Sequence, residues 1–336
     1  MNLPDRILLS RTDRLGDVLL CFPLAAFLKQ VRPDIFIGFL GTSYTRALIE
    51  HCPHIDRYED RETFLASAAI PDYGAILHLY PDLEVARKAA QLRIPVRVGI
   101  RNKIRMWPKL THSILLSRSR SDLHEAELNL QLLRVFDTGK LPGLEEIRAM
   151  ELLRLPLPPH APEKRRVILH PFSAGSAREW PLHRYTELVQ LLQQRGFEVW
   201  ISGSAEEKER ISNWLSNSRS QVRILSGSQS LTEFMNEIQQ ADALVACSTG
   251  PLHIAAALGK VAVGIYSPLR PIFARRWGPL GPFATALSVA EPCRWCRKRP
   301  DRCTCMESIE AQTVVTGIEK LLAEKYEKES DAAGER

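Results

Sequence analysis

The chain has 336 residues, with 45 Lys and Arg against 39 Asp and Glu, so its formal net charge at pH 7 is +6. Hydrophobic residues make up 45% and charged residues 25%, a balance that excludes a wholly disordered chain, a collagen and a disulfide-dense miniprotein. The length suggests two domains of roughly 150 residues each. The mild positive charge permits an anionic partner (phosphate, nucleic acid or membrane) without choosing among them.

Neither a secretory signal nor a membrane span is expected. The first 14 residues mix charges of both signs and lack an apolar core. The most apolar stretch, residues 241–266, is interrupted by the turn at 248–251 and by His253 and Lys260, whereas a spanning helix needs about 20 uninterrupted apolar residues. The expected compartment is therefore the cytoplasm.

Strand-like apolar runs alternate with amphipathic segments of helical length in the first half of the chain. Strands are predicted at residues 6–12, 35–40, 75–79 and 96–100, and helices at 17–31, 43–51, 83–91 and 123–136. This alternation is typical of a parallel sheet covered by helices on both faces. A Pro-rich run at 155–162 then predicts an extended linker.

The same alternation restarts after the linker. Strands are predicted at residues 167–170, 198–202, 222–225, 243–246 and 261–266, and helices at 182–195, 205–217, 231–241, 251–258 and 309–326. The predicted domains are thus 1–155 and 165–325, followed by a charged tail at 326–336 that is expected to fray. Two doubly wound α/β domains predict a ligand-binding cleft where the carboxyl ends of both sheets face each other.

A Gly-Asp pair, Gly16 and Asp17, stands where the first strand turns into the first helix. Gly16 suits the turn, and Asp is a favoured helix N-cap, which is the structural interpretation of Asp17. The functional interpretation is a carboxylate that takes a proton from a hydroxyl nucleophile. The two roles are compatible, because a cap also holds the side chain still. Asp13, nearby, is expected to be a loop residue.

Two later segments have the composition of anion sites. Residues 170–181, HPFSAGSAREWP, place small residues and Arg178 between a strand and a helix, where backbone N–H groups, Ser hydroxyls and a guanidinium can bind a diphosphate. An ordinary strand-to-helix connection is the alternative. In residues 246–259, ACSTGPLHIAAALG, a buried strand ends in a Ser-Thr-Gly turn, with Pro251 starting a helix whose N-terminus favours anions. His253 is either a further ligand contact or a packed core histidine.

Four of the seven cysteines fall within 13 residues, with the spacing C-x2-C-x6-C-x-C, at Cys293, Cys296, Cys303 and Cys305. A four-thiolate structural zinc site is one hypothesis, although the second pair has a single intervening residue. A reduced, basic loop is the other, since disulfides are disfavoured in the cytoplasm. The remaining cysteines, Cys21, Cys52 and Cys247, have apolar neighbours and are predicted to be core residues.

Basic residues also cluster between residues 93 and 109, interleaved with apolar ones. This stretch is either a solvated face or a surface that meets a phosphorylated or membrane-held acceptor. No nucleic-acid-binding motif accompanies it, so we expect no nucleic-acid partner.

Taken in order, four segments resemble glycosyltransferase family 9, the bacterial heptosyltransferases of lipopolysaccharide core synthesis. They are RTDRLGDVLL at 11–20, HPFSAGSAREWP at 170–181, SGSAEEKERI at 202–211 and STGPLHIAAALG at 248–259. The resemblance extends over residues 6–322. It implies the GT-B architecture, in which two Rossmann-like domains face a central cleft. It also implies an inverting transferase that uses a nucleotide sugar, typically ADP-heptose, and requires no metal or other cofactor for catalysis.

The resemblance assigns roles to individual residues. The first domain would bind the acceptor and carry Asp17 as general base, and the second would bind the donor. Arg178 stands where the family has a diphosphate-binding Lys, and Glu207, or its neighbour Glu206, where an acidic residue binds the ribose. Ser248 stands where the family usually has Asp, which leaves the identity of the sugar open. The implied donor-binding residues are Ser173, Gly175, Ser176, Arg178, Glu207, Ser248, Thr249, Gly250 and His253.

The acceptor implied by the resemblance is a lipid-linked saccharide, so the enzyme would work peripherally at the inner face of the cytoplasmic membrane. Its contacts are predicted among the basic residues Arg14, Arg101, Lys103 and Arg105. Two alternatives remain: the same fold with a different nucleotide sugar, and a degenerate, non-catalytic protein that binds an anionic polymer. An NAD-dependent dehydrogenase is disfavoured, because no G-x-G-x-x-G follows either leading strand.

Overall fold

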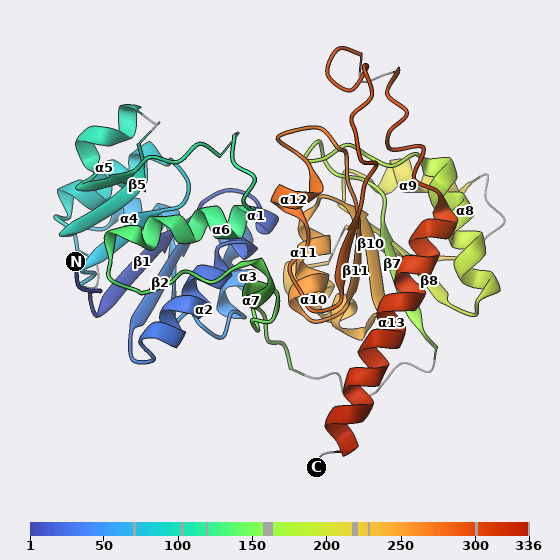
Figure 1. Cartoon of the computed structure of the whole chain (residues 1–336), viewed down its shortest axis with the longest axis horizontal. Helices are drawn as coiled ribbons and strands as arrows, with labels where there is room; N and C mark the ends of the chain where they lie inside the picture. The colour runs from blue at the N-terminus through green and yellow to red at the C-terminus, as the bar shows by residue number, and fades with distance from the viewer. Residues whose placement is uncertain are drawn as a thin grey trace. The chain divides into compact units, whose positions relative to one another are not determined.

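The computed structural model describes residues 1–69, 72–101, 104–118, 120–156, 164–216, 221–227, 229–299 and 302–334. The chain divides into two compact units, Met1–Arg154 and Leu155–Arg336 (Figure 1). The predicted linker lies largely outside the described residues, at 157–163.

The first unit contains a six-stranded parallel sheet in the order β3-β2-β1-β4-β5-β6, the strand order of dinucleotide-binding folds. Its strands are β1 (Arg6–Ser10), β2 (Phe36–Gly41), β3 (Arg57–Asp60), β4 (Ala75–His78), β5 (Val96–Ile100) and β6 (His112–Ile114). Its α-helices are α1 (Leu15–Leu19), α2 (Phe22–Val31), α3 (Arg46–Glu50), α4 (Arg61–Ala66), α5 (Leu83–Gln91), α6 (Glu125–Leu130) and α7 (Leu144–Arg148). Its 3-10 helices are η1 (Ser43–Thr45), η2 (Ile104–Lys109) and η3 (Gln131–Val135).

The second unit repeats this plan with the sheet order β12-β11-β10-β7-β8-β9, again all parallel. Its strands are β7 (Arg166–His170), β8 (Glu198–Gly203), β9 (Arg223–Ser226), β10 (Ala243–Cys247), β11 (Val261–Ile265) and β12 (Ala284–Leu287). Its helices are α8 (Leu182–Gln194), α9 (Lys208–Leu215), α10 (Leu231–Gln240), α11 (Gly250–Ala257), α12 (Ala274–Trp277) and α13 (Ala311–Gly334). Counted from β7, the strand order is that of the first unit.

The central strands are apolar on both faces because helices cover both sides of each sheet. Every residue of β10 and β11 is buried. One face of this second sheet packs against Tyr185 and Leu188 of α8 and against Val314 and Ile318 of α13. Each such side chain contributes about 1.5–3 kcal/mol of transfer free energy, so the sheet is a rigid platform for the loops at its carboxyl edge.

Every strand predicted from the sequence is present, and the predicted α/β class is confirmed. Cys21, Cys52 and Cys247 are buried, as expected. No helix among the described residues is both long and apolar enough to span a membrane.

Four predictions about helices were wrong. The helix expected at 17–31 is two helices: α1 ends at Leu19, and α2 begins at Phe22, with Pro23, which is favoured in a first turn, as its second residue. The helix expected at 43–51 is the 3-10 helix η1 followed by the short helix α3. The helix expected at 123–136 is α-helical only in α6, which ends at Leu130, and it continues as the 3-10 helix η3. The tail expected to fray belongs to α13, which continues to Gly334. The short strands β3, β6 and β12, all three at sheet edges, were not predicted.

Candidate active site

The strand order places the candidate residues at one special position in each sheet. In sheets of this order, ligands bind at the carboxyl edge where successive connections leave in opposite directions, which here is between β1 and β4 and between β7 and β10. Residues 11–17 and 79–82 follow β1 and β4, and residues 171–178 and 248–250 follow β7 and β10. The segments that carry Asp17, Arg178 and Thr249 therefore lie at this position of their own sheets, whereas Glu207 follows β8 and Arg101 follows β5.

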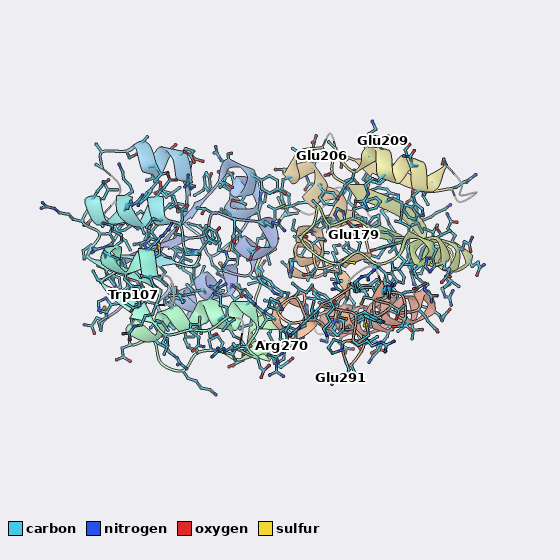
Figure 2. The ribbon with its side chains drawn as sticks, turned by 90° about the horizontal axis from the view of Figure 1, so that it is seen from above. Trp107, Glu179, Glu206, Glu209, Arg270 and Glu291 are labelled. Carbon is cyan, nitrogen blue, oxygen red and sulfur yellow. The ribbon has the colours of Figure 1, made fainter. Side chains whose placement is uncertain are left out.

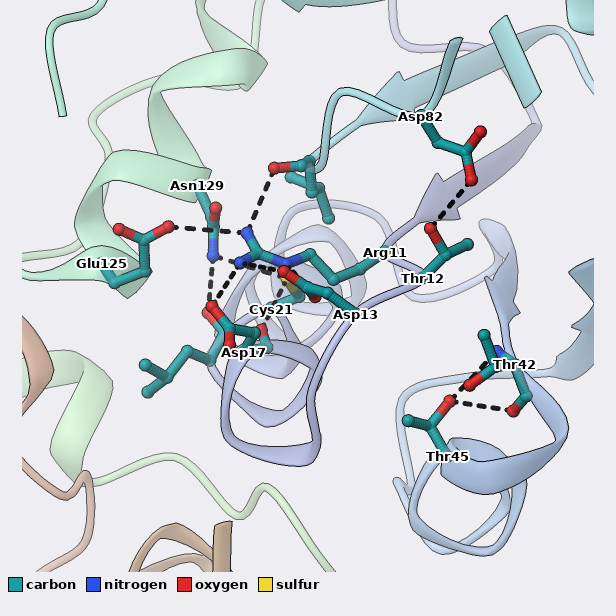
Figure 3. A network of polar contacts seen from close by, with 12 residues as sticks. Arg11, Thr12, Asp13, Asp17, Cys21, Thr42, Thr45, Asp82, Glu125 and Asn129 are labelled. Atoms are coloured by element: carbon teal, nitrogen blue, oxygen red, sulfur yellow. Dashed lines mark hydrogen bonds and ion pairs between the residues drawn. The ribbon is translucent and has the colours of Figure 1, made fainter. Parts of the chain in front are cut away.

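Asp17 lies in the first turn of α1 but does not cap the helix. The N-cap position belongs to Arg14, and Gly16 lies inside α1 and not in the preceding turn. The expected N-cap role of Asp17 and turn role of Gly16 were therefore wrong. Asp17 Oδ1 instead accepts a hydrogen bond from Nη2 of Arg11, which leaves the strand end and points back toward the helix (Figure 3).

Arg11 is the centre of this network and is only 3% exposed. Its Nε and Nη2 donate to the two carboxylate oxygens of Asp13 at 2.7 and 2.9 Å. Its Nη1 donates to the carbonyl of Leu79 at 3.1 Å and lies 3.5 Å from Oε1 of Glu125. A planar guanidinium with this many fixed partners has one orientation, and it therefore holds the Asp17 carboxylate in one orientation too.

Glu125, at the start of α6, anchors the network from the far side (Figure 3). It is fully buried and accepts hydrogen bonds from Arg118 as well as from Arg11. Arg118 also donates to Asn129 Oδ1 and to the Leu79 carbonyl, both at 3.0 Å. Arg11 and Arg118 thus form one compact cluster with the carboxylates of Asp13, Asp17 and Glu125, in which Asp17 remains partly exposed.

The environment of Asp17 makes it a stronger base than an ordinary aspartate. Burial, together with the neighbouring charges of Asp13 and Glu125, raises the pKa of Asp17 to about 6 against the opposing effects of Arg11 and Arg118. A carboxylate with this pKa is ionised at neutral pH and still accepts a proton readily. Asp17 therefore has the chemistry of a general base.

Replacing Arg11 should destabilise the first unit strongly. In Arg11→Met, Asp13, Asp17 and Glu125 lose their shared cation, and breaking a buried ion pair on one side costs about 3–5 kcal/mol. We expect calorimetry to show one transition lowered by about 10 °C. The control is Arg46→Ala, which removes an exposed pair with Glu50 and should cost under about 1 kcal/mol. Equal effects of the two substitutions would contradict the proposed anchoring.

In the second unit, the loop after β7 is shaped by two residues with positive φ, Ala174 at 45° and Gly175 at 75°. Ser173 is buried and makes internal bonds, from its N–H to Glu179 Oε1 at 3.1 Å and from its hydroxyl to the Ala177 carbonyl at 3.0 Å. Ser176 Oγ lies 3.4 Å from the Ser248 carbonyl, so the two predicted donor segments do come together.

The Glu207 carboxylate accepts hydrogen bonds from backbone N–H groups, one of them in this loop. Its Oε1 accepts from the N–H of Ala174 at 3.2 Å and its Oε2 from the N–H of Ser204 at 2.8 Å. It is 6% exposed, whereas its neighbour Glu206 is exposed beside the start of α9 (Figure 2). The Glu207 carboxylate is therefore already bound to backbone amides of the loop.

The turn after β10 presents the N-terminus of α11. Thr249 is the N-cap, Gly250 starts the helix and Pro251 lies in its first turn. The Thr249 hydroxyl is buried and has no hydrogen-bond partner among the described residues, and His253 is buried one turn further on. An unpaired buried hydroxyl beside a helix N-terminus is suited to a phosphate oxygen.

Arg178 connects this loop to the cysteine cluster, because its Nη2 donates to the backbone carbonyl of Cys296. The Sγ atoms of Cys293, Cys296, Cys303 and Cys305 all lie within 4.8 Å of one another. Cys296 Sγ is 3.3, 3.5 and 3.8 Å from those of Cys303, Cys305 and Cys293. Tetrahedral thiolate coordination with metal–sulfur bonds of about 2.3 Å requires sulfur–sulfur distances of about 3.8 Å, so the four cysteines fit a metal ion.

The residues predicted to contact the acceptor lie in separate segments of the first unit. Arg14 is exposed at the N-cap of α1, while Arg101 and Arg105 are exposed after β5 and in η2. Lys103 lies outside the described residues. Close to Arg101 and Arg105 in the chain, the apolar side chains of Ile104, Trp107 and Leu115 are 74%, 44% and 79% exposed. Trp107 is labelled in Figure 2.

Four residues of the network around Asp17 were not predicted as site residues: Arg11, Arg118, Glu125 and Asn129. Arg11 lies within the RTDRLGD segment, but nothing in its sequence context marks it as buried. Glu125 and Asn129 stand on the polar side of a predicted helix, where charged residues are usually solvated. Besides Arg118, their partners lie more than 100 residues away, at Arg11 and Leu20.

The chain therefore combines two Rossmann-like units of the same strand order, one with a carboxylate of raised pKa and the other with a helix N-terminus at the carboxyl edge of its sheet, the plan of a two-domain α/β protein. The model of "Glycosyltransferase family 9 (heptosyltransferase)" matches residues 71–307. The chain belongs to this family and is a glycosyltransferase of the GT-B fold.

Known proteins support this assignment over most of the chain. A Haemophilus influenzae protein assigned to the glycosyltransferases is 27% identical over 315 residues, 86% of this chain and 90% of that protein. Lipopolysaccharide heptosyltransferase 2 of Salmonella typhimurium is 35% identical over 103 residues, 30% of each chain. The structure of E. coli ADP-heptose lps heptosyltransferase II has a TM-score of 0.74 at 21% identity, covering 96% of this chain and 99% of that chain.

A more distant structure is similar in fold and contains a metal. TibC from enterotoxigenic E. coli, described as an iron-containing dodecameric glycosyltransferase, has a TM-score of 0.58 at 15% identity, covering 96% of this chain and 77% of that chain.

Proposed function

We propose that the protein is an inverting heptosyltransferase that moves heptose from ADP-heptose to a lipopolysaccharide core or a related lipid-linked glycan. Asp17 carries the proposal, because it is a basic carboxylate held in one orientation at the ligand-binding edge of its sheet. Family membership and the names of the relatives support heptose as the sugar.

In the proposed reaction, Asp17 accepts the proton of the acceptor hydroxyl as that oxygen attacks the anomeric carbon. The bond between this carbon and the diphosphate oxygen breaks on the opposite side, so the configuration inverts. The electron pair leaves with the nucleoside diphosphate, whose growing negative charge is stabilised by Arg178, His253 and the N-terminus of α11. The diphosphate is a good leaving group, so a single protein base suffices.

The donor is assigned to the second unit. Gly175, Ser176 and Arg178 provide backbone, hydroxyl and guanidinium donors to one phosphate, and Thr249 and Gly250 provide donors to the other. Because the oxygens of Glu207 already accept two amides, we assign the ribose contact to the exposed Glu206 and the support of the loop to Glu207. Ser248 favours one alternative, the same reaction with a different nucleotide sugar.

The acceptor and the membrane are assigned to the first unit. Arg101 and Arg105 alternate with the exposed side chains of Ile104, Trp107 and Leu115, a combination that suits an anionic lipid surface. This surface would keep the enzyme at the inner face of the cytoplasmic membrane, where a lipid-linked acceptor is presented.

Calorimetric titration with ADP, UDP and GDP in metal-free buffer tests the donor assignment. Binding of ADP in the micromolar range and weaker binding of the other two would support ADP-heptose. Preference for UDP or GDP would retain the mechanism and replace the sugar. Binding of none of the three would contradict the transferase proposal.

We also propose that the four clustered cysteines hold a structural metal ion that plays no part in the chemistry. Elemental analysis of the purified protein should find about one zinc or iron per chain, the two metals that four thiolates select. Cys303→Ser should lower this content severalfold. Cys52→Ser is the matched control, since Cys52 is buried in the first unit, and it should keep the metal. Metal-free wild-type protein with four titratable thiols in the cluster would contradict the site.

A further inference from the structure

We propose that the metal site of the four cysteines positions Arg178 for the donor diphosphate, so that metal occupancy controls donor affinity through this one arginine. The inference rests on the proposed function, because it takes Arg178 as the diphosphate ligand. It begins with the hydrogen bond from Arg178 Nη2 to the backbone carbonyl of Cys296, which joins the donor loop to the centre of the cysteine cluster.

Cys296 is the residue of the cluster whose backbone the metal would fix most firmly. It is 1% exposed, and its Sγ lies within 3.8 Å of the other three sulfurs. Its N–H donates to the Cys293 carbonyl at 3.1 Å, and the Cys293 N–H lies 3.4 Å from Cys305 Sγ. A metal bound to these thiolates would therefore fix the turn that presents the Cys296 carbonyl.

The segment that carries the cysteines is held by turns and, after the last cysteine, by the buried side chains of Met306 and Ile309. Between β12 and α13, the described residues form neither an α-helix nor a strand. Four thiolates on one ion would replace the missing backbone ladder, as they do in small zinc-binding folds. Without the ion, the Cys296 carbonyl loses its fixed position and Arg178 loses its restraint.

The rest of the donor loop is held independently of the cysteines. Ser173 and Ala174 are bound by Glu179 and Glu207, and Ser176 contacts Ser248. Two residues after Arg178, Trp180 is buried and its Nε1 donates to the carbonyl of Ile309 at 3.0 Å. Loss of the metal should therefore release the Arg178 side chain while leaving the loop backbone and its remaining donors in place.

A double cycle on the full-length protein tests this mechanism. ADP affinity is measured by calorimetry for wild type and Arg178→Gln, each metal-loaded, stripped by a chelator and reloaded with Zn²⁺. In wild type, stripping should weaken ADP binding about tenfold or more, the effect of losing one charge-assisted hydrogen bond, and Zn²⁺ should restore it. In Arg178→Gln, stripping should change ADP affinity less than about twofold.

The controls separate this mechanism from a merely structural metal and from failure of the proposed function. Cys303→Ser should reproduce the stripped wild type, whereas Cys52→Ser should behave as the loaded one. If stripping weakened ADP binding equally in wild type and in Arg178→Gln, the metal would hold the whole loop. If stripping did not weaken ADP binding in wild type, the metal would not position Arg178. Either result overturns this inference and leaves the proposed function standing. A metal-loaded wild type that binds no nucleotide overturns the proposed function instead.

Discussion

Asp17→Asn should reduce sugar transfer by about 10²–10⁴-fold, the range that a positioned general base contributes. The amide keeps the size of the side chain and can still contact Arg11, but it cannot accept the acceptor's proton. ADP binds to the second unit in our proposal, so its affinity should change less than about twofold. Initial rates of transfer from the nucleotide sugar and a parallel ADP titration check both parts.

The pH dependence of wild type should have the same origin. Because burial raises the pKa of Asp17 to about 6, kcat/KM should fall as the pH drops through that value and reach a plateau above about pH 7. Asp13→Asn is the matched control for Asp17→Asn. Asp13 also pairs with Arg11, but both of its carboxylate oxygens already accept hydrogen bonds from that arginine. If Asp13→Asn abolished transfer and Asp17→Asn left it within tenfold of wild type, the base would be Asp13.

Arg178→Gln should weaken ADP binding by about 10–100-fold, since a hydrogen bond to a charged group contributes about 1.5–3 kcal/mol. Arg178→Lys keeps the charge without the fork of donors, and it should recover part of the affinity. Calorimetry on the two variants measures the difference between charge and geometry.

Arg210→Gln is the control for this experiment. Arg210 lies beside the same loop and pairs with Glu179 at 2.8 Å, but its side chain is 53% exposed. Its loss should change ADP affinity less than about twofold. If Arg210→Gln weakened ADP binding as much as Arg178→Gln does, the effect would come from the loop's stability and not from a direct contact.

Local sequence patterns predicted the central strands and the long helices of both units. The helix at residues 83–91 and the strand at 96–100 have the bounds expected from their apolar spacing. Segments that become strands through pairing with a neighbour were less predictable. The sequence of β3, RYED, has no apolar alternation, and β3 pairs with the edge of β2. Propensity is a weak guide at such edges, where pairing decides.

The site shows the same division. Asp17 and the two turns of the second unit could be named as candidates from the sequence, because each lies next to the strand that positions it. The residues that tune Asp17 were not, since Glu125 reaches Arg11 only through the folded packing of α6. Arg178 and Cys296 are 118 residues apart in the sequence, and no pattern in either segment predicts their contact.

The repeated strand order of the two units has an evolutionary consequence. Each unit carries its own ligand-binding edge after its first and fourth strands, so each can acquire a new specificity without disturbing the core of the other. Recombination near residue 155 would exchange a whole unit together with its chemistry. Under the proposed function, such an exchange would combine one half that determines which hydroxyl is modified with another that determines the activated sugar.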